Sequence, residues 1–323
     1  MRQNERKARD LLAKIKRLLN EELPDTEDAD SPDLGHDDET PSCTPKFLPT
    51  RLLVAAAETA VRINPLNSPL IGPMAAAGAT FAVDDPLKIA VVTAKYWGPE
   101  TRRLTVSFME AANNDVKNKI LSHLNAWSKT CGISFVLTGG VGQIRISRGG
   151  GGFYSYLGTD VLHIPRNRQT MNLEGFTMNT SDSEYKRVVR HEAGHTLGFP
   201  HEHMREALVR RIDRHKAFAY FARTSGWDQQ TVINQVLTPL DGRTILGTPT
   251  DQDSIMCYQL PASITVDGKP IRGGNDINAT DYAFAGRIYP KSGAAIPQSA
   301  TGSSDANWGE EDWPEGDDPD VSV

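Results

Sequence analysis

The run HEAGHTLGFPH constrains this chain more than any other feature of its sequence. Residues four apart on a helix lie on one face, so His191 and His195 can present two imidazoles to one ion. Glu192 follows the first of these histidines, where a general base belongs. Gly198 can adopt a left-handed conformation that ends the helix, and the turn that follows returns His201 as a third nitrogen ligand.

Three nitrogen ligands leave the fourth position of a zinc ion open for water, which distinguishes a catalytic zinc site from a structural one. The short pattern HExxH also arises by chance, whereas the extended pattern HExxHxxGxxH fixes more residue types and spacings. The alternative is a helix of solvated histidines that ends at a glycine. A second motif downstream makes that alternative the weaker one. The residues predict one Zn²⁺ per chain, with Glu192 taking a proton from the attacking water.

The second motif is DQDSIMCYQLP, which contains Met256 and, two residues later, Tyr258. At this point the chain resembles the metzincin zinc peptidases, in which a methionine-containing turn lies beneath the metal. The SIMxY form resembles the astacin branch, and so does GFPHEH, in which Glu202 directly follows the third histidine. The segment NDINATDYAFAGRIYP is similar to the last helix of that fold. The resemblance covers roughly residues 95–290.

The resemblance implies an α+β metzincin fold, with a twisted, mostly parallel five-stranded sheet and helices above a zinc cleft. The lower part of that fold is largely irregular. It also implies a zinc-dependent endopeptidase that hydrolyses peptide bonds of proteins. Tyr258 is then a zinc ligand at rest that later donates a hydrogen bond to the tetrahedral intermediate, and Met256 is an apolar floor.

The family role of Glu202 is a link to the N-terminus of the mature enzyme. This chain keeps Arg205 but then departs from the family pattern, so a local ion pair of Glu202 with Arg205 is the alternative. Two further alternatives stay open for the whole chain. One is an inactive zinc-binding scaffold that binds peptides, and the other is a latent zymogen inhibited by its N-terminal segment.

Hydrophobic and polar periodicity predicts the order of elements along the chain. We expect Thr50 to cap the first helix, and Ser181 with Glu184 to form a capping box at the start of the zinc-binding helix. The expected helices are 50–62, 114–130, the zinc-binding helix and 278–289, and the expected strands are 104–108, 133–137, 143–147 and 161–165.

Four consecutive glycines, 149–152, lack the Gly-Lys-Ser/Thr ending of a phosphate-binding loop, so they predict a turn beside an edge strand. In similar peptidases such an edge strand pairs with the extended substrate through backbone hydrogen bonds. The candidate substrate-binding residues here are Tyr154, Ser155, Tyr156 and Leu157.

Charge and composition divide the chain into three parts. Residues 1–90 form an N-terminal extension with an amphipathic helix, an acidic linker and a candidate pro-segment. Residues 91–292 form the catalytic domain, with an upper part to about 198 and a lower part over 199–292. Residues 293–323 form an acidic tail that we expect to be disordered, because such composition buries little apolar surface.

The sequence also bears on partners and compartment. It has no run of 18 apolar residues, so we expect no membrane span. No basic patch with interleaved aromatic residues indicates nucleic acid. We expect a monomer that acts on protein or peptide substrates. Members of the family are mostly exported, but the N-terminus shows no signal-peptide core, which leaves the compartment open.

The three cysteines are too few and too widely spaced to predict a disulfide framework. Cys257 lies between Met256 and Tyr258, and we expect its side chain to point away from the metal as a small buried hydrophobe. Cys43 precedes the catalytic domain and could cap the zinc as a thiolate that keeps the enzyme latent. The residues around it do not match the switch motif of related peptidases, which argues against that role.

Overall fold

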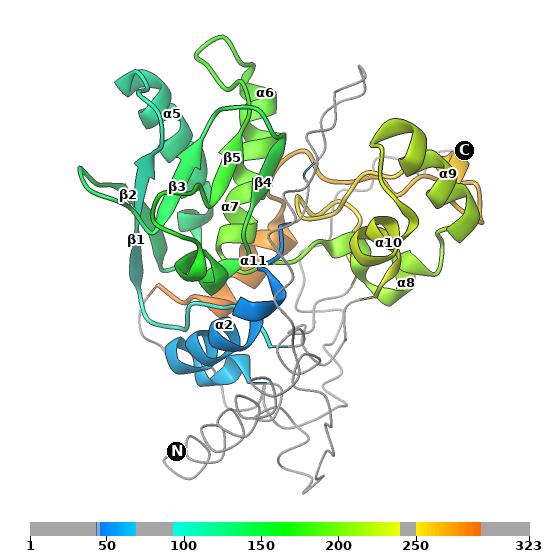
Figure 1. Cartoon of the computed structure of the whole chain (residues 1–323), viewed down its shortest axis with the longest axis horizontal. Coiled ribbons are helices and arrows are strands. Elements are labelled where there is room, and N and C mark those ends of the chain that lie inside the picture. The colour runs from blue at the N-terminus through cyan, green and yellow to red at the C-terminus, as the bar shows by residue number, and fades with distance from the viewer. Residues whose placement is uncertain (1–42, 44–45, 69–92, 240–249, 292–323) are drawn as a thin grey trace, which may run out of the picture.

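The computed structural model describes residues 43, 46–68, 93–239 and 250–291 (Figure 1). Within them a five-stranded sheet has the strand order β2-β1-β3-β5-β4. β4 pairs antiparallel with β5, and the other neighbours pair in parallel, which confirms the mostly parallel sheet expected from the sequence. The strands are β1 (Arg102–Phe108), β2 (Ile133–Leu137), β3 (Ile144–Ser147), β4 (Phe153–Ser155) and β5 (Met171–Leu173).

The α-helices are α2 (Thr50–Ile63), α5 (Asn114–Leu124), α6 (Asp182–Glu184), α7 (Arg190–Thr196), α8 (Glu206–Val209), α9 (Arg214–Thr224), α10 (Gln229–Val232) and α11 (Ala279–Ile288). In Figure 1, α5 lies on one side of α7, the helix that contains His191 and His195, and α8, α9 and α10 lie on the other. The 3₁₀ segments are η1 (Pro65–Asn67), η2 (Asn125–Lys129), η3 (Gly158–His163), η5 (Glu202–Met204) and η7 (Ala262–Ile264), and the π-helical segments are η4 (Tyr185–Val189) and η6 (Ile233–Leu237).

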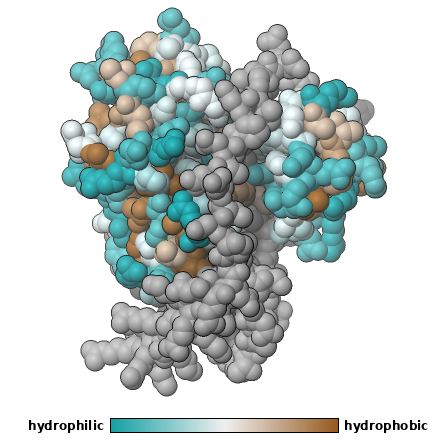
Figure 2. Space-filling view, viewed as in Figure 1, coloured by the Kyte–Doolittle hydropathy of each residue, from teal (hydrophilic) through white to brown (hydrophobic). Residues whose placement is uncertain are grey.

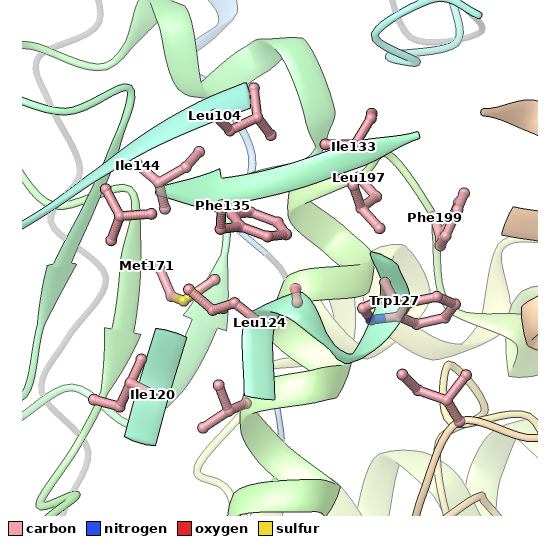
Figure 3. Packing of buried hydrophobic residues seen from close by; sticks show 14 of the residues in the cluster. Leu104, Ile120, Leu124, Trp127, Ile133, Phe135, Ile144, Met171, Leu197 and Phe199 are labelled. Carbon is pink, nitrogen blue, oxygen red and sulfur yellow. The ribbon is translucent and has the colours of Figure 1, made fainter. Parts of the chain in front are cut away.

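The larger core lies between the sheet and helices α5 and α7 (Figure 3). β1 alternates between its two faces, so Leu104 and Val106 are fully buried while Arg103 lies on the other face. Trp127 of η2 and Phe199 extend this core toward the end of α7, and their rings meet edge to face at 5.3 Å.

A second, smaller core lies in the lower part, among α8, α9, α10 and the chain that follows (Figure 1). The sequence predicted a largely irregular lower part, without these short helices. On the face seen in Figure 2, the surface of this part is mostly hydrophilic. The buried members of this smaller core are Leu208, Ile212, Ala217, Phe221, Val232, Val236, Cys257, Leu260, Ile264 and Ile271. None of the helices in the described part has the length and hydrophobicity needed to cross a bilayer.

Two local expectations were wrong. Residues 161–165 do not form a strand, because most of this segment belongs to η3 or to the loop after it. Thr50 does not cap α2, since Pro49 occupies the N-cap position and no side chain caps the helix there. The predicted amphipathic helix, most of the acidic linker and the acidic tail lie outside the described residues.

Candidate metal centre

The helix that carries the first two histidines runs without a break through α6, η4 and α7. Ser181 caps its start by accepting a hydrogen bond from the backbone N–H of Glu184 at 3.2 Å. The carboxylate of Glu184 binds Arg187 of the next turn. This helix places His191 and His195 on its inner face, as their spacing predicts.

The third histidine returns to the first two because the chain reverses at Gly198. This residue has φ of 98°, a conformation that L side chains rarely adopt. The Nε2 atom of His201 then lies 3.1 Å from Nε2 of His191 and 3.1 Å from Nε2 of His195. All three side chains are buried. The structure thus brings the three predicted ligands together.

Two backbone carbonyls fix which ring nitrogens face the centre. Nδ1 of His191 donates to the carbonyl oxygen of Ile255 at 2.6 Å, and Nδ1 of His195 donates to that of Phe199 at 2.8 Å. A carbonyl oxygen only accepts, so both Nε2 atoms carry lone pairs. Tetrahedral zinc with Zn–N bonds of about 2.0–2.1 Å would hold nitrogens roughly 3.3 Å apart, close to the separation seen. The residues present therefore fit a zinc ion.

Burial keeps these rings neutral. It lowers the pKa of His191 to about 4 and holds the pKa of His195 and of His201 well below the usual value for histidine. The carbonyl of Ile255 opposes the effect at His191 but does not overcome it. All three lone pairs are consequently available at neutral pH without prior loss of a proton.

Cys43 is the fourth group of the centre, which corrects the sequence-based expectation. Its sulfur lies 3.5 Å from Nε2 of His195, and one potential ligand atom from each of these four residues lies within 4.8 Å of the others. The neighbours of Cys43 do not match the switch motif of related peptidases, so the sequence argued against this position. What brings the thiol here is strand pairing: Cys43 forms a parallel bridge with Phe153, and Lys46 forms one with Tyr156.

Glu192 is fully buried beside Cys43. Burial raises the pKa of its carboxyl to about 8, and a contact with the thiol partly opposes this. Burial, and then the nearby Glu192 charge, raise the pKa of the Cys43 thiol well above its ordinary value. A bound cation would stabilise the thiolate of Cys43 and so lower the pKa of this thiol.

The methionine turn lies directly against α7. A Cβ atom placed on Gly194 would come within 2.3 Å of the Met256 sulfur, so helix and turn approach closely here. Cys257 points into the smaller core, which confirms the expectation for its side chain. Tyr258 packs its ring 5.5 Å from that of His201 and 5.2 Å from that of His203. Its position is near the centre, and its predicted role as a ligand stays a prediction.

Glu202 forms the local ion pair that was the alternative to its family role. Its carboxylate lies 3.0 Å from the Arg205 guanidinium and also accepts from the backbone N–H of Asp251. Burial raises the pKa of Glu202 to about 7, with Arg205 opposing the shift.

The predicted substrate edge is occupied by the chain's own N-terminal segment. Tyr154 and Ser155 belong to the edge strand β4, and Tyr156 and Leu157 follow it directly. The Ser155 hydroxyl lies 2.9 Å from that of Thr196 and so connects the strand to the end of α7. The Lys46 ammonium lies over the Tyr154 ring at 4.9 Å.

Asp281 has a contact at the site that the sequence did not predict. This buried residue of α11 binds the methionine turn through Ser254 and Ile255. Its one sequence signal was the pair Asn278 and Asp281 at capping-box spacing, which indicates a helix start and no contact with a distant turn.

Comparisons with known proteins show the family of the chain. The peptidase family described as "Astacin" matches residues 91–269. A structure of myroilysin is 33% identical to the chain, covers 61% of it and 96% of its own length, and has a TM-score of 0.57. A hatching-enzyme zinc-protease of the medaka fish Oryzias latipes, high choriolytic enzyme 1, is 22% identical over 57% of this chain and 86% of its own, with a TM-score of 0.40. A comparison with curated proteins gave no significant match. The family match spans more than half of the sequence and contains the three histidines and the methionine turn, so the chain belongs to the astacin family of metallopeptidases.

Proposed function

We propose that this chain is a zinc-dependent endopeptidase with His191, His195 and His201 as ligands and Glu192 as its general base. The observation that carries the proposal is the convergence of three neutral histidine nitrogens beside a buried carboxylate on the same helix. A metal-binding scaffold without activity would need the histidines but not the glutamate.

Each residue has a distinct part in the proposed reaction. Bound zinc polarises the scissile carbonyl and makes a water molecule acidic enough to lose a proton near pH 7. The Glu192 carboxylate accepts that proton and passes it to the leaving nitrogen. Strand β4 aligns an extended peptide through backbone hydrogen bonds, which accommodates many sequences. Tyr258, whose ring lies near that of His201, donates a hydrogen bond to the developing oxyanion.

We further propose that the chain is latent as long as residues 43 and 46–68 remain docked. Cys43 occupies the position beside the histidines that water would need and pairs with Phe153 of β4, and Lys46 pairs with Tyr156 just after that strand. Leu48 and Ala56 form a small cluster with Ile164 of the catalytic domain. The segment is therefore held by apolar packing as well as by the thiol.

Hydrogen bonds hold the same segment at two further points. The Thr59 hydroxyl lies 2.8 Å from Nε2 of His163, which joins α2 to η3. The Asn67 side chain donates to the carbonyl of Tyr96 and accepts from its N–H, at 2.8 and 3.0 Å. Because these contacts do not involve Cys43, loss of the thiol alone should open the fourth position of the metal without undocking α2.

One experiment tests both parts. Zinc content and casein cleavage are measured for the parent chain, for Glu192→Gln, for Cys43→Ser and for the variant with both substitutions, and fragments are mapped by mass spectrometry. We expect about one zinc in each, greater cleavage at internal bonds by Cys43→Ser than by the parent, and none by Cys43→Ser combined with Glu192→Gln.

Other outcomes would contradict specific parts of the proposal. Zinc in every variant with cleavage in none, even after removal of residues 1–68, would indicate a peptide-binding scaffold. Equal cleavage by the parent and Cys43→Ser would remove the latency proposal but keep the peptidase. Stepwise loss of residues from chain ends would indicate an exopeptidase.

A further inference from the structure

We propose that Asp281 is a positioning residue of the metal centre, because its carboxylate holds the methionine turn that in turn fixes two of the zinc ligands. This inference rests on the proposed zinc site. It concerns a residue far from that site in sequence, on the last helix of the domain.

The Asp281 carboxylate accepts hydrogen bonds from three directions. One oxygen accepts from the Ser254 hydroxyl at 2.6 Å. The other accepts from the backbone N–H of Ile255 at 2.9 Å and from that of Asn278 at 3.1 Å. The side chain is buried, so these three donors replace the water that would otherwise surround the charge.

The methionine turn connects Asp281 to His191 through a series of hydrogen bonds. Ser254 uses its hydroxyl oxygen to accept from the N–H of Met256 at 3.0 Å, while its proton goes to Asp281. Ile255 donates its N–H to Asp281 and accepts from Nδ1 of His191 at its carbonyl, at 2.6 Å. The carboxylate thus fixes the peptide that selects the tautomer of His191 and the direction of its ring.

The same turn also holds the third ligand. The carbonyl of Met256 accepts from the backbone N–H of Glu202 at 2.8 Å, and Glu202 directly follows His201. A displaced turn would therefore move His191 and His201 relative to His195, which is oriented by Phe199 just after the end of α7. Two of the three ligands depend on Asp281, and one does not.

Helix α11 is anchored independently of the metal. The Thr130 hydroxyl donates to the carbonyl of Tyr282 at 2.7 Å, which joins the helix to the loop after η2. Asn278 caps α11 by accepting from the N–H of Asp281 at 2.8 Å. The larger core consequently fixes the position of the Asp281 carboxylate, and the methionine turn binds to that carboxylate.

The test compares full-length chains that carry Asp281→Ala, Asp281→Asn and Asn278→Ala. Asn278→Ala is the matched control, since it removes the side-chain cap of α11 and a contact with Asp251. It keeps the Asp281 carboxylate, the backbone N–H that donates to it, and the Thr130 contact that anchors the helix. Zinc dissociation constants are measured by competition with a chromophoric chelator, and visible spectra of the cobalt-substituted proteins report ligand geometry. Thermal unfolding of each variant reports its overall stability.

We expect Asp281→Ala to weaken zinc binding by about 10-fold or more and to change the cobalt spectrum, as losses of such supporting contacts do elsewhere. Asp281→Asn should recover part of the affinity, because its amide oxygen can accept from Ile255 and its N–H can donate to Ser254. Asn278→Ala should lower the melting temperature and leave zinc affinity and the cobalt spectrum unchanged.

Parental zinc affinity and spectrum in Asp281→Ala would overturn the inference while leaving the peptidase intact. Equal losses in Asp281→Ala and Asn278→Ala would also overturn it, because the effect would then be one of helix stability. If Asp281→Ala does not fold, Ser254→Ala removes one of the three hydrogen bonds to the carboxylate. We expect this variant to weaken zinc binding to a smaller degree. An unchanged affinity in Ser254→Ala would overturn the inference. A parent chain that binds no zinc would overturn the proposed function as well.

Discussion

Two of the three candidate ligands are oriented by separate backbone contacts. His195 depends on Phe199, four residues later in the chain, whereas His191 depends on Ile255, which is distant in sequence. The spacing of the histidines along one helix is a local pattern, so the histidines and Glu192 could be predicted from the sequence. The contact between Cys43 and His195 spans 152 residues and depends on pairing with an edge strand, which no local pattern reveals.

Gly198 is the residue whose conformation returns His201 to the centre. Its φ of 98° is strained for any side chain, and a Cβ there would lie 3.1 Å from the carbonyl oxygen of Lys95. We expect Gly198→Ala to reduce the free energy of unfolding by about 1–2 kcal/mol or more and to weaken zinc binding. Chemical denaturation and chelator competition measure the two effects. Gly150→Ala, where a Cβ meets open space, is the control; equal effects at both positions would contradict the prediction.

At the level of elements, the strands with clear alternation and the edge strand after the four glycines were predicted, but β5 was not. β5 has three residues, too few to show a period. Residues 161–165 have an apolar pattern, but Arg145 binds the carbonyls of Ile164 and Pro165, at 3.0 and 3.3 Å. Gly158, with φ of 46°, starts a tight turn against Lys95 instead of an extended chain. These non-local contacts override the local preference for a strand.

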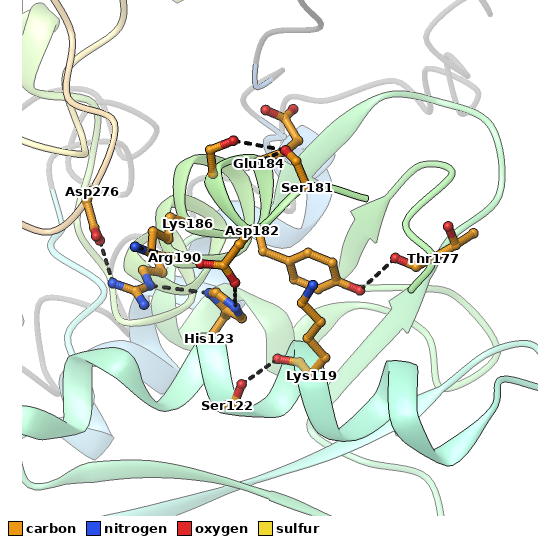
Figure 4. A network of polar contacts seen from close by, with 12 residues as sticks. Lys119, Ser122, His123, Thr177, Ser181, Asp182, Glu184, Lys186, Arg190 and Asp276 are labelled. Atoms are coloured by element: carbon orange, nitrogen blue, oxygen red, sulfur yellow. Dashed lines mark hydrogen bonds and ion pairs between the residues drawn. The ribbon is translucent and has the colours of Figure 1, made fainter. Parts of the chain in front are cut away.

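A polar network joins α5 to the histidine-bearing helix (Figure 4). His123 of α5 accepts a hydrogen bond from the Arg190 side chain at 3.4 Å and lies 3.5 Å from Asp182. Arg190 also pairs with Asp276 before α11. Burial, followed by the charge of Arg190, lowers the pKa of His123, and Asp182 opposes the shift.

Acid should weaken this junction. Since the folded pKa of His123 lies below its unfolded value of about 6.5, the unfolded chain binds more protons below that pH, and stability falls as the pH drops. We expect His123→Gln to lose less stability than the parent between pH 8 and pH 5.5. Urea denaturation at both pH values measures the stability that the parent and the variant lose. The other histidines contribute equally in both chains and cancel in the comparison. An equal or larger loss in the variant would contradict the prediction.

At the scale of the whole molecule, two cores meet at the metal centre. Met256 packs in the larger core and Cys257 in the smaller one, so the methionine turn belongs to both. The resemblance in sequence predicted a division into upper and lower parts because, in that fold, the sheet and the zinc helix form the upper part and the chain after Gly198 forms the lower part. The boundaries at residues 90 and 292 remain predictions, since the neighbouring segments lie outside the described residues.

Removal of zinc should therefore destabilise the whole domain. A ligand at 100 times its dissociation constant stabilises the folded state by about 2.7 kcal/mol. For a chain of this size we expect EDTA to lower the melting temperature by roughly 5–10 °C. Differential scanning calorimetry measures the change, and zinc added in excess should restore it where calcium does not. An unchanged melting temperature would show that the histidines contribute no metal-linked stability.

The position of Cys43 upstream of the histidines also determines the order in which the parts of the centre are made. Synthesis proceeds from the N-terminus, so this thiol leaves the ribosome 152 residues before His195. The methionine turn and Asp281 follow later still. The thiol that we propose to be inhibitory is thus already present whenever the last histidine is placed, and in a newly made molecule the three histidines never converge before Cys43 has been synthesised.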